Sequence, residues 1–317
     1  MTNQIQKESD CLDAGGHRWA VILAGGDGTR LRPLTRRLSG DDRPKQFCNV
    51  LGDETLLDQT LRRVARIVCP ERTFSVVTKT HETFYAAHRT EVGDTGLLVQ
   101  PGNRGTGPAI VYSLMRLHEM DPRAVVAFFP SDHHFADEEA LSDCVRQAFE
   151  CAESHSNAVI LLGVAPNRPE TEYGWIEPGE PLMAGGPSLV FGVRRFWEKP
   201  SREAAIELMR RGCFWNSFIM VGRVGSFLNL VGRTAPHLFR SFQAIAPAFF
   251  TKREEASVLN VYMSLPSSSF STDVLSVCPD NLAVLCSRTL EWADVGDVGR
   301  ALSLMRCERT RIAIATG

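Results

Sequence analysis

The chain has 317 residues, of which 44% are hydrophobic and 23% charged, and its formal net charge is −2. This size and composition are typical of a soluble globular protein with one large or two modest domains. The near-neutral charge gives no electrostatic reason to expect nucleic acid or a membrane surface as a partner, and no apolar run reaches the ~18 residues of a membrane-spanning helix.

The N-terminal segment and the cysteines show no pattern of export or of metal binding. Residues 1–17 are polar and lack the apolar core of a signal peptide, so we expect a flexible tail and a cytoplasmic protein. The nine cysteines are odd in number and show no Cys-x-x-Cys spacing. This usage favours buried, reduced thiols over disulfides or a metal site.

Short apolar runs alternate with amphipathic stretches through the first half of the chain. The run from Ala124 to Pro130 is typical of a central parallel strand that is buried on both faces. We predict strands over 19–23, 74–77, 97–100 and 124–130, and helices over 55–68, 80–90 and 109–120. The alternation predicts an α/β fold with a doubly wound, mostly parallel sheet, whose ligands bind beyond the carboxyl ends of the strands.

The second half is less regular. Ser201 is suited to begin a helix and Gly212 to end it. We predict strands over 158–164, 188–197 and 214–221, helices over 201–211, 224–231, 236–249 and 252–265, and a loop over 179–187. No stretch has the composition of a linker between independent domains, so we expect a single domain over residues 18–317.

A glycine-rich loop directly follows the first predicted strand. Gly25, Gly26 and Gly28 would let backbone N–H groups approach a phosphate without interference from a Cβ atom. Arg30 and Lys45 add positive charge nearby, and Arg suits a bidentate grip on phosphate oxygens. A Gly-rich turn with solvated basic side chains has the same pattern. The spacing excludes the Walker loop and the Gly-x-Gly-x-x-Gly dinucleotide fingerprint.

Two aspartates lie at turns that are far apart in the sequence. Asp132 follows the central strand, and Asp294 lies late in the chain. Mg²⁺ takes few protein carboxylates and completes its octahedron with water and substrate oxygens, so two such residues could hold it if the fold brings them together. Each could instead cap a helix or a turn. His133 and His134 have no nearby Cys or His that would favour zinc.

The loop and the segment from Arg43 to Phe47 resemble the signature of the sugar-phosphate nucleotidyltransferases, most closely the mannose-1-phosphate guanylyltransferases. Further segments resemble family motifs in the family's order between Ala20 and Gly296. These are Pro-x-Asp-His at Asp132, Trp-x-Asp-Val-Gly at Asp294, Arg-Asn-Thr-Ala-Pro-Ala from Arg104, Pro-x-Thr-Gly-Tyr-Gly around Gly174, Glu-Lys-Pro at Glu198–Lys199, Trp-Asn-Ser-Gly at Trp215–Phe218 and Phe-Ser-Ile-Asp at Phe270–Asp273.

The resemblance implies a Rossmann-like, glycosyltransferase-A-like fold with an inserted sugar-binding part. The nucleotide-binding half would cover about 18–155 and the sugar-binding half about 156–300. It also implies a role for each matching residue. The nucleotide would contact Leu23, Ala24, Gly25, Gly26, Gly28, Thr29, Gln100, Arg104 and Thr106; Arg30 and Lys45 would neutralise the triphosphate; Asp132 and Asp294 would hold Mg²⁺; and Gly174, Glu198, Lys199, Asn216 and Asp273 would bind the sugar phosphate.

The family pattern implies transfer of a nucleotidyl group to a sugar 1-phosphate, with GTP and mannose 1-phosphate as the closest substrates and a homodimer as one assembly. Gln100 replaces Glu and Gly105 replaces Asn in the base-side segment, and Glu172 stands where Gly is usual. Residues 36–42 make the lobe before Lys45 longer, which suggests a flexible cover. UDP-, dTDP- or CDP-sugar synthesis and a catalytically silent nucleotide-sugar-binding homologue remain the alternatives.

Overall fold

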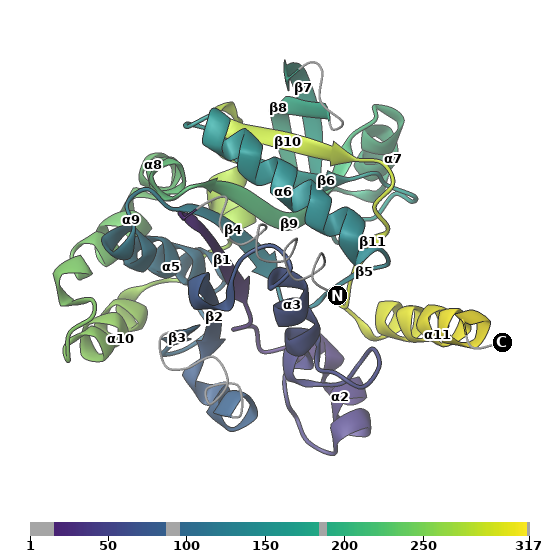
Figure 1. Cartoon of the computed structure of the whole chain (residues 1–317), viewed down its shortest axis with the longest axis horizontal. Helices are drawn as coiled ribbons and strands as arrows, with labels where there is room; N and C mark the ends of the chain where they lie inside the picture. Colours follow the sequence, from purple (N-terminus) through teal and green to yellow (C-terminus); the bar gives the residue numbers. More distant parts are fainter. Residues whose placement is uncertain (1–15, 87–95, 184–188, 316–317) are drawn as a thin grey trace, which may run out of the picture.

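A computed structural model describes residues 16–86, 96–183 and 189–315, with side chains up to residue 307. Within these residues one nine-stranded sheet crosses the molecule (Figure 1). Its strands, in spatial order, are β3 (Leu97–Gln100), β2 (Thr73–Thr78), β1 (Arg18–Leu23), β4 (Val125–Pro130), β9 (Phe214–Arg223), β6 (Val159–Val164), β10 (Leu282–Ser287), β8 (Leu189–Glu198) and β7 (Gly174–Met183).

The sheet contains both parallel and antiparallel strand pairs. Strands β3, β2, β1 and β4 pair in parallel, as do β6 and β10. All six residues of β4 are buried, as expected for a strand that is covered on both faces. Strand β9 runs antiparallel between β4 and β6, and β7 and β8 form an antiparallel edge. The predicted α/β fold is confirmed.

Helices cover both faces of the sheet, and each face has its own apolar core. The first face packs against α3 (Leu56–Val64), α6 (Glu138–Ser154) and α7 (Arg202–Arg210). The second packs against α5 (Thr106–Met120), α8 (Val224–Thr234), α9 (Pro236–Gln243) and α10 (Glu254–Ser264). The predicted caps of α7 are confirmed, because the Ser201 hydroxyl accepts a hydrogen bond from the Ala204 N–H and Gly212 has a φ of 73°.

A small lobe lies beside the end of β1. It contains α2 (Arg32–Ser39) and the start of α11 (Val298–Ala315), which extends away from the body in Figure 1. Leu31, Leu34 and Ala301 share one apolar cluster there, so the two helices pack together. Residues 36–39, expected in a flexible cover, therefore belong to a helix whose end at Gly40 has a φ of 78°.

The remaining elements are short. Strands β5 (His133–Phe135) and β11 (Trp292–Asp294) form a separate antiparallel pair. The short helices are η1 (Thr29–Leu31), η2 (Lys45–Phe47), η3 (Pro70–Arg72), η4 (Lys79–His81), η6 (Ala246–Ala248), η7 (Ser271–Leu275) and η8 (Pro279–Asn281). No helix in the described part of the chain is long and apolar enough to cross a membrane.

The observed elements differ from the predicted ones in a few places. The prediction of a loop over 179–187 is wrong for residues 179–183, because β7 continues through Met183. Residues 184–187 lie outside the described part. The helix predicted over 80–90 is seen over 82–86, and residues 87–90 also lie outside. The predicted N-terminal tail is described only at Gly16 and His17, whose imidazole Nδ1 lies 2.8 Å from Asp121 Oδ2. The eight described cysteines are free thiols.

Candidate active site

A cavity of about 440 Å³ lies where β1, β3 and β4 end. The cavity brings together residues from segments that are up to 271 positions apart in the chain, between Leu23 and Asp294. Ten of the predicted site residues line it: Leu23, Gly25, Gly26, Arg30, Gln100, Thr106, Asp132, Glu198, Lys199 and Asp294.

The glycine-rich loop is held in place by hydrogen bonds to its own carbonyl oxygens. The buried Gln46 amide donates from Nε2 to Ala24 O at 2.7 Å and to Gly26 O at 2.8 Å. Gly28 has a φ of 59°, and a Cβ atom there would lie 3.0 Å from the backbone nitrogen of Lys45. Sequence reasoning did not single out Gln46, although the residue stands directly after Lys45 in the same motif.

Pairing between β5 and β11 brings the two predicted metal carboxylates to the same end of the cavity. Asp294 lies opposite His133, and the Val295 N–H donates to Asp132 O at 2.9 Å. The Asp132 carboxylate forms an ion pair with Lys45, with 2.6 Å between Oδ2 and Nζ. Burial, the largest single effect, would raise the pKa of Asp132, but the charges of Lys45 and His133 and the hydrogen bonds together outweigh it, so the pKa is lowered.

Asp294 has two partners of its own. Its Oδ1 accepts hydrogen bonds from the Tyr173 hydroxyl at 2.8 Å and from Arg300 Nη1 at 2.6 Å. Burial, with a further contribution from Asp294, raises the pKa of Tyr173 to about 12, so its hydroxyl remains a donor at neutral pH. Sequence reasoning missed both Tyr173 and Arg300 as members of the site.

Arg30 faces a carboxylate from the opposite wall. Arg30 Nη1 lies 3.2 Å from Glu172 Oε2, and both side chains are about half exposed. An exposed pair of this kind adds little stability. Glu172 stands where the family motif has Gly, so this ion pair is a feature of the present chain.

The segments that follow β8 and begin β9 carry strained backbone at the cavity wall. Lys199 has a φ of 45° and Phe218 a φ of 58°, and both line the cavity. The buried Asn216 accepts a hydrogen bond from the Phe218 N–H at 3.1 Å and so holds this stretch of β9, where its pairing with β6 shifts register. Strain of this kind is retained mainly at functional sites.

Gly174 and Glu198 are paired across β7 and β8. A Cβ atom at Gly174 would lie 2.8 Å from the Phe196 ring and 3.2 Å from Glu198 Oε2, so the position has no room for a side chain. Burial raises the pKa of Glu198 against the smaller opposing effects of Lys199 and Ser271.

The other predicted site residues do not line this cavity. They are Ala24, Gly28, Thr29, Lys45, Arg104, Gly174, Asn216 and Asp273. Arg104 Nε donates to Tyr262 O at 3.2 Å. Asp273 accepts hydrogen bonds from the Ser268 hydroxyl at 2.6 Å and the Ser269 N–H at 3.0 Å, and it lines a neighbouring hollow with Thr106. The Ser268 N–H also donates to Arg104 O at 2.9 Å, so Arg104 and Asp273 both help to position the loop around Ser268.

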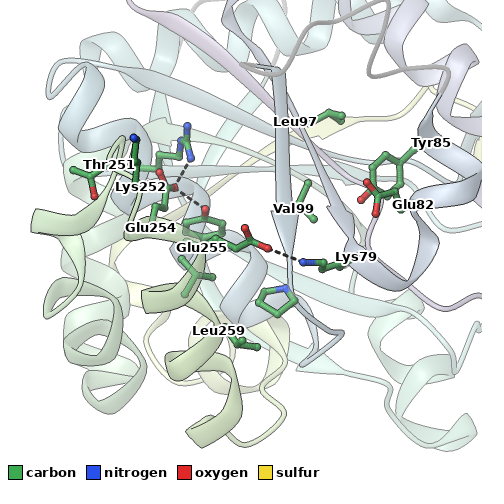
Figure 2. Close-up of a pocket in the computed structure, with 14 residues that line it drawn as sticks. Lys79, Glu82, Tyr85, Leu97, Val99, Thr251, Lys252, Glu254, Glu255 and Leu259 are labelled. Atoms are coloured by element: carbon green, nitrogen blue, oxygen red, sulfur yellow. Dashed lines mark hydrogen bonds and ion pairs between the residues drawn. The ribbon is translucent and has the colours of Figure 1, made fainter.

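A larger cavity, of about 680 Å³, lies on the far side of β3 against α10 (Figure 2). Four of its charged groups form two ion pairs: Lys79 Nζ lies 2.6 Å from Glu255 Oε1, and Arg116 pairs with Glu254. It contains neither the glycine-rich loop nor the two aspartates. We therefore take the smaller cavity as the candidate active site.

The fold and this cavity together define an α/β protein with a glycine-rich loop, basic side chains and two aspartates around one ligand-sized space. A model of the nucleotidyl transferase family matches residues 19–307, and the chain belongs to that family.

Relatives of known function are similar over most of this chain. Mannose-1-phosphate guanylyltransferase 2 of Escherichia coli O157:H7 is 30% identical over 288 residues, which are 87% of this chain and 58% of that protein. Mannose-1-phosphate guanylyltransferase ManC of Salmonella typhimurium is also 30% identical, over 88% of this chain and 57% of that protein. The chain thus spans less than two thirds of the length of these relatives.

Solved structures show the same fold. A mannose-1-phosphate geranyltransferase from Thermus thermophilus superimposes with a TM-score of 0.75 and 31% identity, over 90% of this chain and 79% of that one. A UDP-glucose pyrophosphorylase shares the fold at a TM-score of 0.56 with 13% identity, over 93% of this chain and 99% of that one.

Proposed function

We propose that this protein transfers a nucleotidyl group from a nucleoside triphosphate to a sugar 1-phosphate, releasing pyrophosphate. The observation that carries the proposal is the single cavity that joins the glycine-rich loop, Arg30, the two aspartates and the Glu198–Lys199 pair. Family membership over residues 19–307 supports the same reaction class.

In this reaction a phosphate oxygen of the sugar 1-phosphate attacks the α-phosphorus of the triphosphate. The new P–O bond forms as the bond to the β-phosphate breaks. A phosphate monoester is already a nucleophile, so the protein needs no covalent intermediate and contributes positioning and charge neutralisation. Gly25 and Gly26 would hold the α-phosphate, Arg30 and Lys45 the triphosphate, and Lys199 the acceptor phosphate.

The donor set fits a magnesium ion. Asp132 and Asp294 offer hard oxygen ligands at one end of the cavity. Asp132 bonds Lys45 through Oδ2, and Asp294 bonds Tyr173 and Arg300 through Oδ1. The other oxygen of each carboxylate does not take part in these short bonds. No cluster of three or more His, Cys, Asp or Glu side chains suited to a metal occurs in the described residues. Substrate oxygens and water would therefore complete the coordination, and the ion would neutralise phosphate charge when bound.

The substrates that we favour are GTP and mannose 1-phosphate, because the curated relatives are named mannose-1-phosphate guanylyltransferases. The proposal keeps a nucleotide-binding half over about 18–155 and a sugar-binding half over about 156–300. It places the enzyme in the cytoplasm and allows a homodimer.

The test is a matrix of GTP, UTP, dTTP, CTP and ATP against several sugar 1-phosphates, with pyrophosphate release as the signal. We expect the highest kcat/KM with GTP and mannose 1-phosphate, and a loss of several orders of magnitude in Lys45→Ala and in Asp294→Ala. A folded protein that binds nucleotide sugars but releases no pyrophosphate with any pair would instead be the catalytically silent homologue.

A further inference from the structure

We propose that Phe218 is a specificity-determining residue, whose ring forms an apolar wall for the C–H groups of the acceptor's sugar. The inference rests on the proposed function and specifies which side of the acceptor the cavity selects. The motif that this segment resembles has Gly at this position, which carries no side chain. The ring is therefore a feature of the present chain.

A bulge in β9 carries Phe218 to the cavity. Leu161 of β6 lies opposite Met220 of β9. The next pair, Gly163 with Asn216, leaves three residues of β9 opposite one residue of β6, and Phe218 is the middle one of the three. Bulges beside active sites redirect side chains. This one places Phe218 in the wall of the candidate active site.

The backbone at Phe218 is strained and firmly held. Its φ of 58° lies in the left-handed region, which bulky side chains rarely adopt. The Phe218 N–H donates to Asn216 at 3.1 Å, and the hydroxyl of the buried Ser217 donates to Leu162 O at 2.7 Å. Gly takes up this conformation without strain, so the strain comes from the aromatic side chain. Strain of this kind persists mainly where function requires it.

Phe218 lies where the apolar core meets the cavity. It packs against the core cluster on the second face of the sheet but is only partly buried, so part of the residue stays accessible from the cavity. Leu23, Val76 and Ala109 pack in the same cluster and also line the cavity. A ligand in this space thus meets an apolar wall that includes Phe218.

The position of β9 in the sheet associates Phe218 with the acceptor rather than with the triphosphate. Strand β9 pairs with β7 at Trp175, directly after Gly174, and Gly174 pairs with Glu198. Both Gly174 and Glu198 are among the residues proposed to bind the sugar phosphate. Strand β4 separates β9 from β1 and the glycine-rich loop.

A sugar ring carries both hydroxyl groups and C–H groups, and an aromatic wall distinguishes between them. C–H groups gain from packing against the large apolar surface of a Phe ring. A hydroxyl group that is buried against the same ring loses its hydrogen bonds to water without replacement. Phe218 therefore favours an acceptor that turns C–H groups toward the ring and its hydroxyl groups toward the polar side of the cavity, at Glu198 and Lys199.

The experiment is equilibrium binding of GDP-mannose and of GDP to the wild-type chain and to Phe218→Gly. The ratio of the two affinities isolates the contribution of the sugar. We expect wild type to bind GDP-mannose more tightly than GDP, and this ratio to fall by about fivefold in Phe218→Gly, in the range of one lost aromatic contact.

The matched control is Phe250→Gly. Phe250 is also a phenylalanine in the left-handed region, with a φ of 61°, but it lies under the guanidinium group of Arg116 beside the larger cavity. Phe250→Gly removes the same side chain from the same backbone conformation outside the candidate active site, so its ratio should equal that of wild type.

Phe218→Asn separates the ring from the backbone. Asn adopts the left-handed conformation more readily than most residues, so this variant removes the ring without the added flexibility of Gly. Its ratio should fall as in Phe218→Gly, with circular dichroism to check that both variants fold. A folded Phe218→Asn or Phe218→Gly with the wild-type ratio overturns the proposal.

A wild-type protein that binds GDP-mannose no more tightly than GDP also overturns the proposal. The proposed function fails separately. A wild-type protein that prefers GDP-mannose, and loses that preference in both Phe218 variants, yet releases no pyrophosphate with any sugar 1-phosphate, would contradict the proposed reaction and leave the role of Phe218 in sugar recognition standing.

Discussion

Glu172 places a negative charge in a cavity that we propose to hold a triphosphate. Its carboxylate pairs with Arg30 at 3.2 Å, and the two side chains are 48% and 57% exposed. The motif that this segment resembles has Gly at this position, which carries no carboxylate. In the present chain the triphosphate must compete with Glu172 for the guanidinium group.

Glu172→Gln should therefore lower the KM for the nucleoside triphosphate. An exposed ion pair is worth ~0.2–1 kcal/mol, so we expect a decrease of up to roughly fivefold with little change in stability. The effect should shrink at high salt, because exposed charges are screened. Glu207→Gln, which removes the same charge from the exposed face of α7, is the control. An equal change in both variants would contradict a local role for Glu172.

Glu198, which we propose to bind the sugar phosphate, lowers stability at neutral pH, because burial raises its pKa above the ordinary value of 4.5. A carboxyl group with a raised folded-state pKa favours folding most below its unfolded value, and this contribution is lost as pH rises through the folded-state pKa. Glu198→Gln has no such loss. The variant should thus gain thermal stability relative to wild type as pH rises above 4.5, while its KM for the sugar 1-phosphate increases.

Thermal melts between pH 4 and 8 check the stability of Glu198→Gln. Glu203→Gln is the control, since the pKa of Glu203 is lowered by hydrogen bonds from its own backbone N–H and from Ser201, and its removal should have the opposite pH dependence. Parallel melting curves for wild type and Glu198→Gln at all pH values would refute the argument.

At the scale of elements, the parallel strands were the most predictable part of the molecule. Strands such as β1 and β4 are continuous apolar runs because helices cover both of their faces. Strand β7 was not predicted, because Pro178, Gly179 and Pro181 are typical of a loop. The sheet accommodates them at register shifts between β7 and β8, at its edge, where a missing N–H costs little.

The site was predictable where a motif is contiguous and unpredictable where a partner comes from elsewhere in the chain. Asp132 and Asp294 stand in recognisable motifs, whereas Tyr173 reaches Asp294 across 121 positions and Tyr262 reaches Gln100 across 162. Such contacts depend on the order of strands in the sheet, which a single sequence does not determine.

Gly105 shows how one element fits another at the start of α5. It is the N-cap residue, with a φ of 86° and a ψ of −175°, and a Cβ atom there would overlap the Ser268 carbonyl oxygen. This backbone conformation is almost confined to glycine. The replacement of the family's Asn by Gly105 is therefore linked to the close packing of the loop around Ser268.

Gly105→Ala should lower the free energy of unfolding by ~1–3 kcal/mol through backbone strain, with a further loss from displacement of the Ser268 loop. Gly102→Ala, three residues earlier, is the matched control because a Cβ atom there would have no neighbour within 4 Å and the φ of Gly102 is not positive. Urea unfolding of the two variants checks the difference. Equal stabilities would show that the Ser268 loop moves at no cost.

At the scale of the whole molecule, the candidate active site is connected to the helix that leaves the body. Arg300, in the first turn of α11, bonds Asp294 at 2.6 Å and also pairs with Asp297. Ala301 packs with Leu31 and Leu34, so the same turn also supports the helix that follows the glycine-rich loop. A change in the charge of Asp294 would thus alter the contacts of the first turn of α11.

This connection predicts a competition between Arg300 and the metal. If Asp294 holds Mg²⁺, the ion must weaken the Arg300–Asp294 bond, because both cations seek the same carboxylate. Arg300→Ala should therefore reach half-maximal activity at a lower Mg²⁺ concentration than wild type. It should also lose ~1.5–3 kcal/mol of stability, the range for a hydrogen bond to a charged group.

Titration of Mg²⁺ against pyrophosphate release, together with urea unfolding, measures both effects. Arg300→Lys is the conservative variant: it keeps the positive charge but lacks the planar fork that bridges Asp294 and Asp297, so it should lose stability with a smaller change in the Mg²⁺ midpoint. An unchanged midpoint in a folded Arg300→Ala would show that Asp294 does not share its carboxylate between the two cations, and would remove the proposed link between metal binding and α11.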